Sequence, residues 1–210
     1  MFRSRCKNLF FSCYNIDRGV MMKTDAFFSD LSTRNNIFII ENIDDSIKKK
    51  FENKYSKYNN KFFFEQFTRC GGIIIDNWIR LYGCGELNVV EKNEKYNRSG
   101  MVDILIGEDV LGGLFGLKDE YLYYFAPDTN EWENLEVYYT QFIDWLINLQ
   151  DGVNQFYELF RWSTWKEDCK NLKISEGYHF YPSLQFKSDI EKRDRKVISI
   201  DELIRFNLQI

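Results

Sequence analysis

Apolar positions near the start of the chain repeat with the 3.6-residue period of an amphipathic helix. In DDSIKKKFENKYSKYNNK they share one stripe, made of Ile47, Phe51, Tyr55 and Tyr58. Asp44 or Asp45 precedes the stripe and is a suitable N-cap. The pattern predicts a surface helix whose lysine-rich and asparagine-rich face is solvated.

The middle of the chain changes to short apolar runs separated by glycine and polar turns, which is typical of β-strands. GGIIIDNWIRLYGCGE and MVDILIG are two such runs, and VVEKNEKYNRSG between them indicates a polar loop. GLFGL, YLYYFAP and EWENLEV follow, with turns at residues 118–120 and 128–130. The spacing predicts a meander of antiparallel strands.

The last third returns to a helical period. One face of VYYTQFIDWLINL carries Tyr138, Phe142, Trp145, Leu146 and Leu149. Thr164 with Glu167, and Ser199 with Glu202, have capping-box spacing and predict helices over WKEDCKNL and ELIRFNL. EGYHFYPSLQF is predicted to be extended, and residues 187–196 to form a charged loop. Helices, strands and helices again predict an α+β fold with a central, mostly antiparallel sheet and flanking N- and C-terminal helices.

The length of 210 residues fits one domain, and aromatic residues at 18% supply a large apolar core. We assign residues 26–210 to a single α+β domain and residues 1–25 to an N-terminal extension. The extension is either disordered or the result of a mis-set start, because Met21 and Met22 offer a second start. Every apolar run is shorter than the roughly 18 residues that span a membrane.

Cysteine and histidine usage indicates neither a disulfide framework nor a zinc site. The five cysteines contain no C-x-x-C pair, and His179 is the single histidine. We expect inert thiols in a cytoplasmic protein and predict no metal or cofactor. His179 alternates with bulky aromatics, which indicates a strand position rather than a catalytic one.

Charge is distributed unevenly around the net value of −4. Residues 1–61 hold 12 Lys/Arg against 7 Asp/Glu, whereas residues 103–136 hold 9 Asp/Glu and only Lys118. An acidic segment argues against nucleic acid and suits a basic protein partner, although a merely solvated surface explains it as well. The predicted partner-binding residues are Glu108, Asp109, Asp128, Glu131, Trp132 and Glu133.

Motifs for enzymes are weak. Gly112, Gly113 and Gly116 form G-G-x-x-G before a strand, not G-x-G-x-x-G before a helix, so we interpret them as sheet glycines. Three carboxylate pairs could serve a hydrolase if they faced one another: Glu108/Asp109, Asp119/Glu120 and Glu131/Glu133. Their adjacency or turn placement predicts solvated side chains instead.

Several blocks carry a resemblance: GGIIIDNWIRLYGCGE, EDVLGGLFGL, YYFAPDTNEWE, FIDWL, FYELFRWSTWKEDC and FYPSLQF. In this order they resemble an uncharacterised bacterial family, a domain of unknown function, over about residues 63–210. More loosely, the strand pattern and the helix YYTQFIDWL are similar to the SUKH superfamily. Members of that superfamily are often immunity proteins that bind and neutralise secreted toxins, many of them nucleases. The resemblance implies a SUKH-like α+β fold and no catalysis.

We therefore expect a cytoplasmic, non-catalytic protein-binding module, an immunity protein whose partner is a basic toxin domain, with no nucleic-acid or membrane partner. Two alternatives stay open: a carboxylate-based hydrolase, and an interaction domain with another regulatory role. A hydrolase requires two acidic side chains that converge in a pocket, whereas a binding module requires only an exposed surface.

Overall fold

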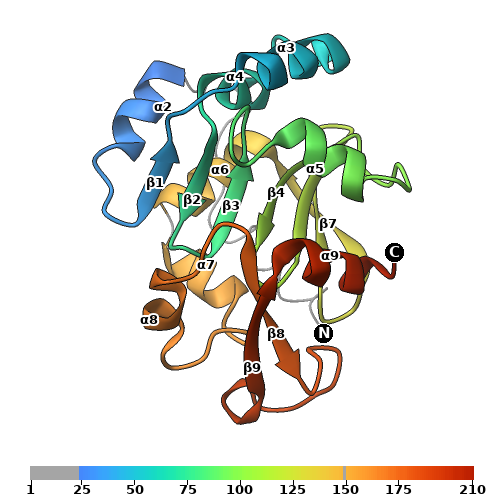
Figure 1. Cartoon of the computed structure of the whole chain (residues 1–210). Helices are drawn as coiled ribbons and strands as arrows, with labels where there is room; N and C mark the ends of the chain where they lie inside the picture. Colours follow the sequence, from blue (N-terminus) through green and yellow to red (C-terminus); the bar gives the residue numbers. More distant parts are fainter. Residues whose placement is uncertain (1–23, 149) are drawn as a thin grey trace.

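A seven-stranded antiparallel sheet forms the centre of the molecule (Figure 1). The computed structural model describes residues 24–148 and 150–210. The strands lie in the sheet in the order in which they occur in the chain: β1 (Ile37–Ile40), β2 (Gly72–Ile75), β3 (Ile79–Tyr82), β4 (Ile104–Asp109), β5 (Leu114–Lys118), β6 (Tyr121–Ala126) and β7 (Glu131–Tyr138). This order confirms the predicted antiparallel meander and the α+β class.

Helices cover both faces of the sheet. In Figure 1, α6 (Tyr139–Asn148) and α7 (Gln150–Phe156) lie behind it, and α5 (Val89–Tyr96) and α9 (Ile200–Leu208) lie in front. Behind the sheet, the rings of Phe115 and Phe142 have centroids 5.0 Å apart. In front, Asn207 Nδ2 of α9 donates to the Leu111 carbonyl at 3.1 Å. We call these sides the α6–α7 face and the α5–α9 face.

The remaining elements lie around the two ends of the strands. They are α2 (Thr24–Leu31), α3 (Asp45–Lys54), η1 (Ser56–Tyr58), α4 (Phe62–Arg69), α8 (Trp165–Lys170), β8 (Glu176–Tyr181), η2 (Ile190–Lys192) and β9 (Asp194–Ser199). Strands β8 and β9 form a separate antiparallel hairpin. The hairpin is attached to the main sheet because the Tyr178 N–H donates to the Val110 carbonyl at 2.7 Å.

Aromatic side chains fill the core, as the composition predicts. Trp78, Trp145 and Trp162 are almost completely buried, and the rings of Trp78 and Trp162 lie 5.8 Å apart. The Trp78 and Trp165 rings pack edge to face with centroids 5.3 Å apart, and such pairs contribute beyond the area that they bury. The core therefore joins the sheet to the C-terminal third of the chain through tryptophan contacts.

Local sequence signals explain several element boundaries. Asp44 caps α3, because its carboxylate accepts from the N–H groups of Ser46 and Ile47 at 2.8 and 3.2 Å. The run GGIIIDNWIRLY forms the two strands β2 and β3. A three-residue turn, Asp76 to Trp78, joins them, and Asp76 and Asn77 have φ values of 56° and 52°, in the left-handed region that tight hairpin turns use.

The predicted loop over VVEKNEKYNRSG is wrong, because its first part forms α5. Asn88 caps this helix and accepts from Val90 N and Glu91 N at 3.1 Å each. The buried side of α5 includes Asn93, whose amide bonds both backbone groups of Leu105 in β4. Apolar periodicity misses a helix whose buried face contains a polar residue.

Two smaller predictions also need correction. Residues 187–196 are not one charged loop, because η2 and the start of β9 lie within them; β9 is almost entirely exposed and so shows no apolar alternation. Thr164 and Ser199 are N-caps of α8 and α9, but neither side chain makes a capping bond. Thr164 Oγ1 donates to Asp168 Oδ2 instead, at 2.8 Å.

Strand β7 contains an irregularity where it pairs with β6. Tyr123 lies opposite Asn134, whereas Tyr121 lies opposite Tyr138, so β7 has two extra residues in this interval. Glu136 lies within it with a φ of 58°. A bulge of this kind bends the strand and interrupts its ladder.

The prediction for the chain start falls mostly outside the described residues. Residues 1–23 are not described, and Thr24 and Asp25 already belong to α2. Assignment of residues 26–210 to one domain stays a prediction.

Replacing Asn93 tests the role of α5. Asn93→Ala leaves the N–H and C=O of Leu105 without their side-chain partner in a buried position, so we expect the free energy of unfolding to fall by about 2–3 kcal/mol. Urea denaturation followed by circular dichroism measures this. Glu94→Ala, at an exposed position of the same helix, is the control and should cost at most about 0.5 kcal/mol.

Candidate functional site

The six residues predicted to bind a partner do not share one surface. Glu108 and Asp109 are completely buried, with 0% exposure, so the prediction that they present charge to a partner is wrong. Glu133 is 8% exposed and lies opposite Tyr124 on the α6–α7 face, so it is misplaced for the same role. Only Asp128, Glu131 and Trp132 reach the surface, and Glu131 is the most open of the three.

Asp109 is a buried carboxylate that accepts four hydrogen bonds. Its Oδ1 accepts from the N–H groups of Leu111 and Gly113, each at 2.9 Å. Its Oδ2 accepts from the hydroxyls of Tyr124 at 2.6 Å and Tyr157 at 2.9 Å. Burial raises the pKa of Asp109, and the four donors oppose that rise. The residue ties the β4–β5 turn to β6 and to the segment after α7.

The hydrogen bonds of Asp109 leave no room for a side chain at Gly113, and the backbone conformation at Gly112 favours glycine. A Cβ at Gly113 would lie 2.5 Å from Asp109 Oδ2 and against the Tyr124 hydroxyl. Gly112 has a φ of 76°, which favours glycine. A Cβ at Gly116, within β5, would meet Val102. The interpretation as sheet glycines therefore holds for Gly116 in β5, whereas Gly112 and Gly113 lie in the turn between β4 and β5.

Glu108 serves the opposite side of the sheet. Its carboxylate accepts from Lys92 Nζ at 2.6 and 2.8 Å and from the Tyr82 hydroxyl at 2.8 Å. Arg80 Nη1 lies 3.9 Å from it. Successive strand residues point to opposite faces, so Glu108 and Asp109 cannot face each other as a hydrolytic pair.

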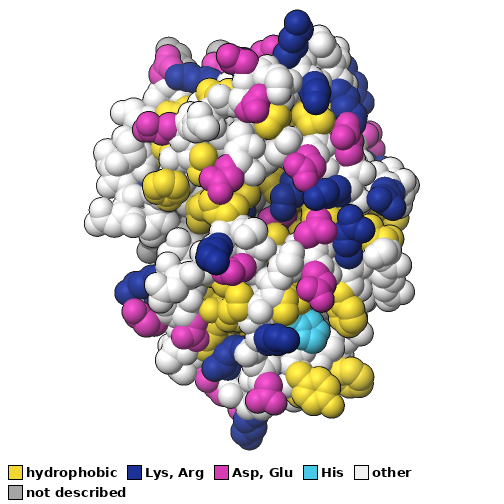
Figure 2. Space-filling view, in the orientation of Figure 1, with side chains coloured by type: hydrophobic (Ala, Val, Ile, Leu, Met, Phe, Trp, Pro, Cys, Tyr) yellow, Lys and Arg dark blue, Asp and Glu magenta, His cyan; other side chains and the backbone are white. Residues whose placement is uncertain are grey.

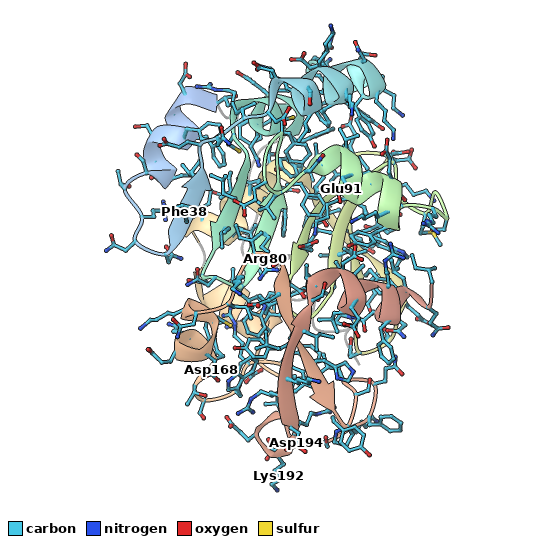
Figure 3. All side chains as sticks on the ribbon, viewed as in Figure 1. Phe38, Arg80, Glu91, Asp168, Lys192 and Asp194 are labelled. Atoms are coloured by element: carbon cyan, nitrogen blue, oxygen red, sulfur yellow. The ribbon has the colours of Figure 1, made fainter. Side chains whose placement is uncertain are left out.

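Arg80 connects the main sheet to the C-terminal hairpin (Figure 3). Its Nη2 donates to the backbone carbonyls of Lys173 at 3.1 Å and Glu176 at 2.7 Å, just before and at the start of β8. Burial lowers the pKa of Arg80, and the charge of Glu108 opposes this. The role of Arg80 in the described contacts is to hold the hairpin on the sheet.

Arg161 is a second buried cation, which the sequence predictions missed. Its guanidinium carbon lies 3.8 Å from the centroid of the Trp165 ring, 5.0 Å from that of Trp78 and 5.4 Å from that of Tyr157. Burial lowers its pKa to about 10, so it is charged at neutral pH. The R-W-x-x-W spacing in FRWSTW was the available signal, because it places an arginine and a tryptophan four residues apart.

An aromatic strip lies on the α5–α9 face over the last two strands, and consists of Tyr121, Tyr123, Trp132 and Tyr138. The rings of Tyr121 and Tyr138 stack with centroids 4.9 Å apart. Tyr123 Oη accepts from Asn134 Nδ2 at 3.2 Å, and the Trp132 ring packs on Phe125. Strand pairing puts these side chains on one face, and Tyr121 is 37% exposed.

A second group of exposed aromatic residues lies at the C-terminal hairpin. His179 is in β8, so its predicted strand position is confirmed, and its ring contacts Phe206 of α9 edge to face at 5.5 Å. Tyr181 and Phe186 are largely exposed nearby in the sequence. Figure 2 shows hydrophobic side chains gathered beside this histidine.

The described cysteines Cys70, Cys84 and Cys169 are free and buried. Burial raises the pKa of each thiol to about 12. Cys6 and Cys13 lie outside the described residues. Within residues 24–148 and 150–210, no three His, Cys, Asp or Glu side chains gather as metal ligands, and no helix is long and apolar enough to span a membrane.

Residues 64–203 match a family model described as "Protein of unknown function DUF2625". The chain belongs to the DUF2625 family. The matched range includes β2 to β8, Asp109, Arg161 and the aromatic strip. It agrees with the predicted resemblance to an uncharacterised family over about residues 63–210, whereas the looser SUKH resemblance stays a prediction.

Two proteins with sequences similar to this chain are described as uncharacterized. The protein YbfG of Escherichia coli K12 is 38% identical over 152 residues, which are 67% of this chain and 69% of the relative. A protein of Haemophilus influenzae is 29% identical over 149 residues, 62% of this chain and 64% of the relative. The chain therefore spans about two thirds of the length of each.

Asp109→Asn tests the buried carboxylate. The substitution puts an amide NH₂ where two tyrosine hydroxyls donate, so we expect the free energy of unfolding to fall by about 2–4 kcal/mol. Denaturant titration measures the change. The matched control is Asp119→Asn in the exposed β5–β6 turn, which should change stability by no more than about 0.5 kcal/mol. Equal stability of the two variants would contradict the assignment.

Thiol labelling tests the raised pKa values. A thiol with a pKa of about 12 has almost no thiolate at mildly alkaline pH, so iodoacetamide should leave Cys70, Cys84 and Cys169 unmodified in the folded protein. All three should react once guanidinium chloride unfolds the chain. Peptide mapping by mass spectrometry distinguishes these cysteines from Cys6 and Cys13. Rapid labelling of any of the three before unfolding would contradict the burial described.

Proposed function

We propose that this DUF2625 protein is a non-catalytic module that binds a basic protein through the aromatic strip. The observation that carries the proposal is a row of tyrosine and tryptophan side chains on one face of the sheet, in which Tyr121 is exposed and the other three are partly exposed. Tyrosine and tryptophan supply large contact area with little loss of side-chain entropy, and they are enriched among the residues that dominate binding energy.

Acidic side chains around the strip support a basic partner. The exposed ones near its end and edge are Asp103, Asp119, Glu120, Glu131 and Glu136. Asp119 N–H donates to Asp103 Oδ2 at 3.0 Å, which brings two of these charges together. The nearby cations include Lys118, Lys57, which interacts with the charge of Asp103, and Lys61, which is paired with Glu120. Such a rim accelerates association with a basic surface and makes the affinity fall with salt.

An immunity protein is the biological role that we propose for this module. The SUKH resemblance supports it, and the nuclease toxins that such proteins neutralise are basic where they meet nucleic acid. A cytoplasmic location belongs to the same proposal and is supported by the three free thiols. A hydrolase that uses Glu108 and Asp109 is disfavoured because both carboxylates are buried and satisfied by other protein groups.

Substitution in the strip tests the binding surface. The chain is co-expressed with each basic secreted toxin domain encoded in its own genome, and host survival identifies a partner for affinity measurement. The double variant Tyr121→Ala/Tyr138→Ala should then weaken the complex by roughly 30-fold or more, because it removes two stacked interface rings.

Tyr181→Ala is the matched control, because Tyr181 is a more exposed tyrosine on a different surface and should change affinity by less than about twofold. Affinity of the unsubstituted chain should also fall steeply as salt is added. Undiminished binding by the double variant would exclude the strip as the interface. If the chain binds and neutralises none of the tested toxins, the immunity role is contradicted.

A further inference from the structure

Arg161 keeps two hydrogen-bond donors unused although its side chain is only 5% exposed. Nη1 donates to the Asn154 side-chain oxygen. Nε and Nη2 are buried and have no acceptor among the described residues. These two nitrogens lie side by side on one edge of the guanidinium. Together they can donate two parallel hydrogen bonds to the two oxygens of one carboxylate.

The surroundings of Arg161 contain further unused donors. Trp78 Nε1 and Arg80 Nη1 are also buried without an acceptor in the part of the chain that the structure describes. The guanidinium carbon of Arg161 lies 5.0 Å from the centroid of the Trp78 ring, in the β2–β3 turn, and Arg80 lies two residues further along the chain, in β3. Cys169 and Asp109 each interact electrostatically with both arginines. A buried N–H without an acceptor is costly, and the nearby carboxylates do not accept from these four nitrogens, so an additional acceptor would stabilise this region.

The carboxylate nearest to Arg161 does not fill this role. Asp76 Oδ2 lies 4.0 Å from Arg161 Nη2, which is too long for a hydrogen bond. The other oxygen of Asp76 accepts from Asn36 Nδ2 at 3.0 Å, which holds the carboxylate at the β2–β3 turn. Asp76 therefore reduces the local positive charge without satisfying Nε or Nη2.

We propose that Nε and Nη2 of Arg161 bind the carboxylate of a small organic acid, whose apolar body packs against the Trp78 and Trp165 rings. Rings on several sides at 3.8 to 5.4 Å from the guanidinium favour an organic anion over a fully hydrated inorganic one. Because Arg161 is covered, binding requires the Trp165 ring to move. Trp165 begins the short helix α8 and has the closest ring to the cation.

This site is separate from the proposed protein interface. Arg161 lies beside the β2–β3 turn, whereas the aromatic strip belongs to β6 and β7, at the other edge of the sheet. Either proposal can fail while the other holds.

Anion titrations on the full chain test the inference. Sodium acetate, benzoate, phosphate and chloride are compared at equal ionic strength and neutral pH, with tryptophan fluorescence and the melting temperature as readouts. We expect benzoate to bind more tightly than acetate, because its ring packs against tryptophan, and chloride to give no saturable change. Stronger binding of phosphate than of either carboxylate, or equal responses to all four anions, would overturn the assignment.

Variants locate the binding. Arg161→Lys keeps the charge but loses the paired donors, and should weaken benzoate binding at least tenfold. Arg205→Lys, at a partly exposed position of α9 where the arginine pairs with Asp201, is the control and should bind as the unsubstituted chain does. If Arg161→Lys binds benzoate with unchanged affinity, the benzoate does not bind at Arg161 and is an adventitious additive only.

A variant that is expected to bind benzoate more tightly tests the site independently, because misfolding would weaken binding rather than strengthen it. Asp76→Asn removes the negative charge beside the site while an amide oxygen still accepts from Asn36, so benzoate should bind several-fold more tightly. An affinity that is unchanged or weaker in a folded Asp76→Asn variant would contradict the placement of the anion at Arg161.

Discussion

The buried carboxylate of Asp109 is the interaction on which the rest of the architecture depends. Desolvating a charge is costly, and the cost is met here by two backbone N–H groups and two tyrosine hydroxyls from distant parts of the chain. These donors fix the β4–β5 turn, place β6 beside it and hold the segment after α7 against the sheet. Loss of any donor would leave part of a buried charge uncompensated, so the four contacts act as a unit.

Alternation along β4 gives the molecule two charged centres rather than one. Glu108 points to the α5–α9 face, where Lys92 neutralises it and Arg80 carries the connection onward to the hairpin. Asp109 points to the α6–α7 face. Two adjacent acids thereby attach different layers to the same strand. The arrangement also explains why the acidic segment of the chain is a poor guide to surface charge.

Most of the fold could be predicted from local pattern, but the site could not. Capping at Asp44, the strand meander and the helix after β7 follow from residue types that act on near neighbours. Burial of Asp109 depends on Tyr157, which is 48 residues away, and the environment of Arg161 depends on Trp78 from another element. Without knowledge of such partners, the sequence pattern predicts that adjacent acids are solvated. A polar residue such as Asn93 on a buried helix face likewise interrupts the apolar periodicity by which a helix is predicted.

The bulge at Glu136 has a consequence for how copies of this chain avoid one another. Among the strands of residues 24–148 and 150–210, β7 is the longest and lies at an edge of the sheet, where unpaired backbone groups could recruit a strand from a second molecule. The left-handed residue breaks the row of outward N–H and C=O groups, and the glutamates on β7 repel an identical strand. At the other edge, β1 offers only four residues. Among the described strands, one edge of the sheet is thus bulged and charged and the other is short, and both features disfavour edge-to-edge pairing of two copies.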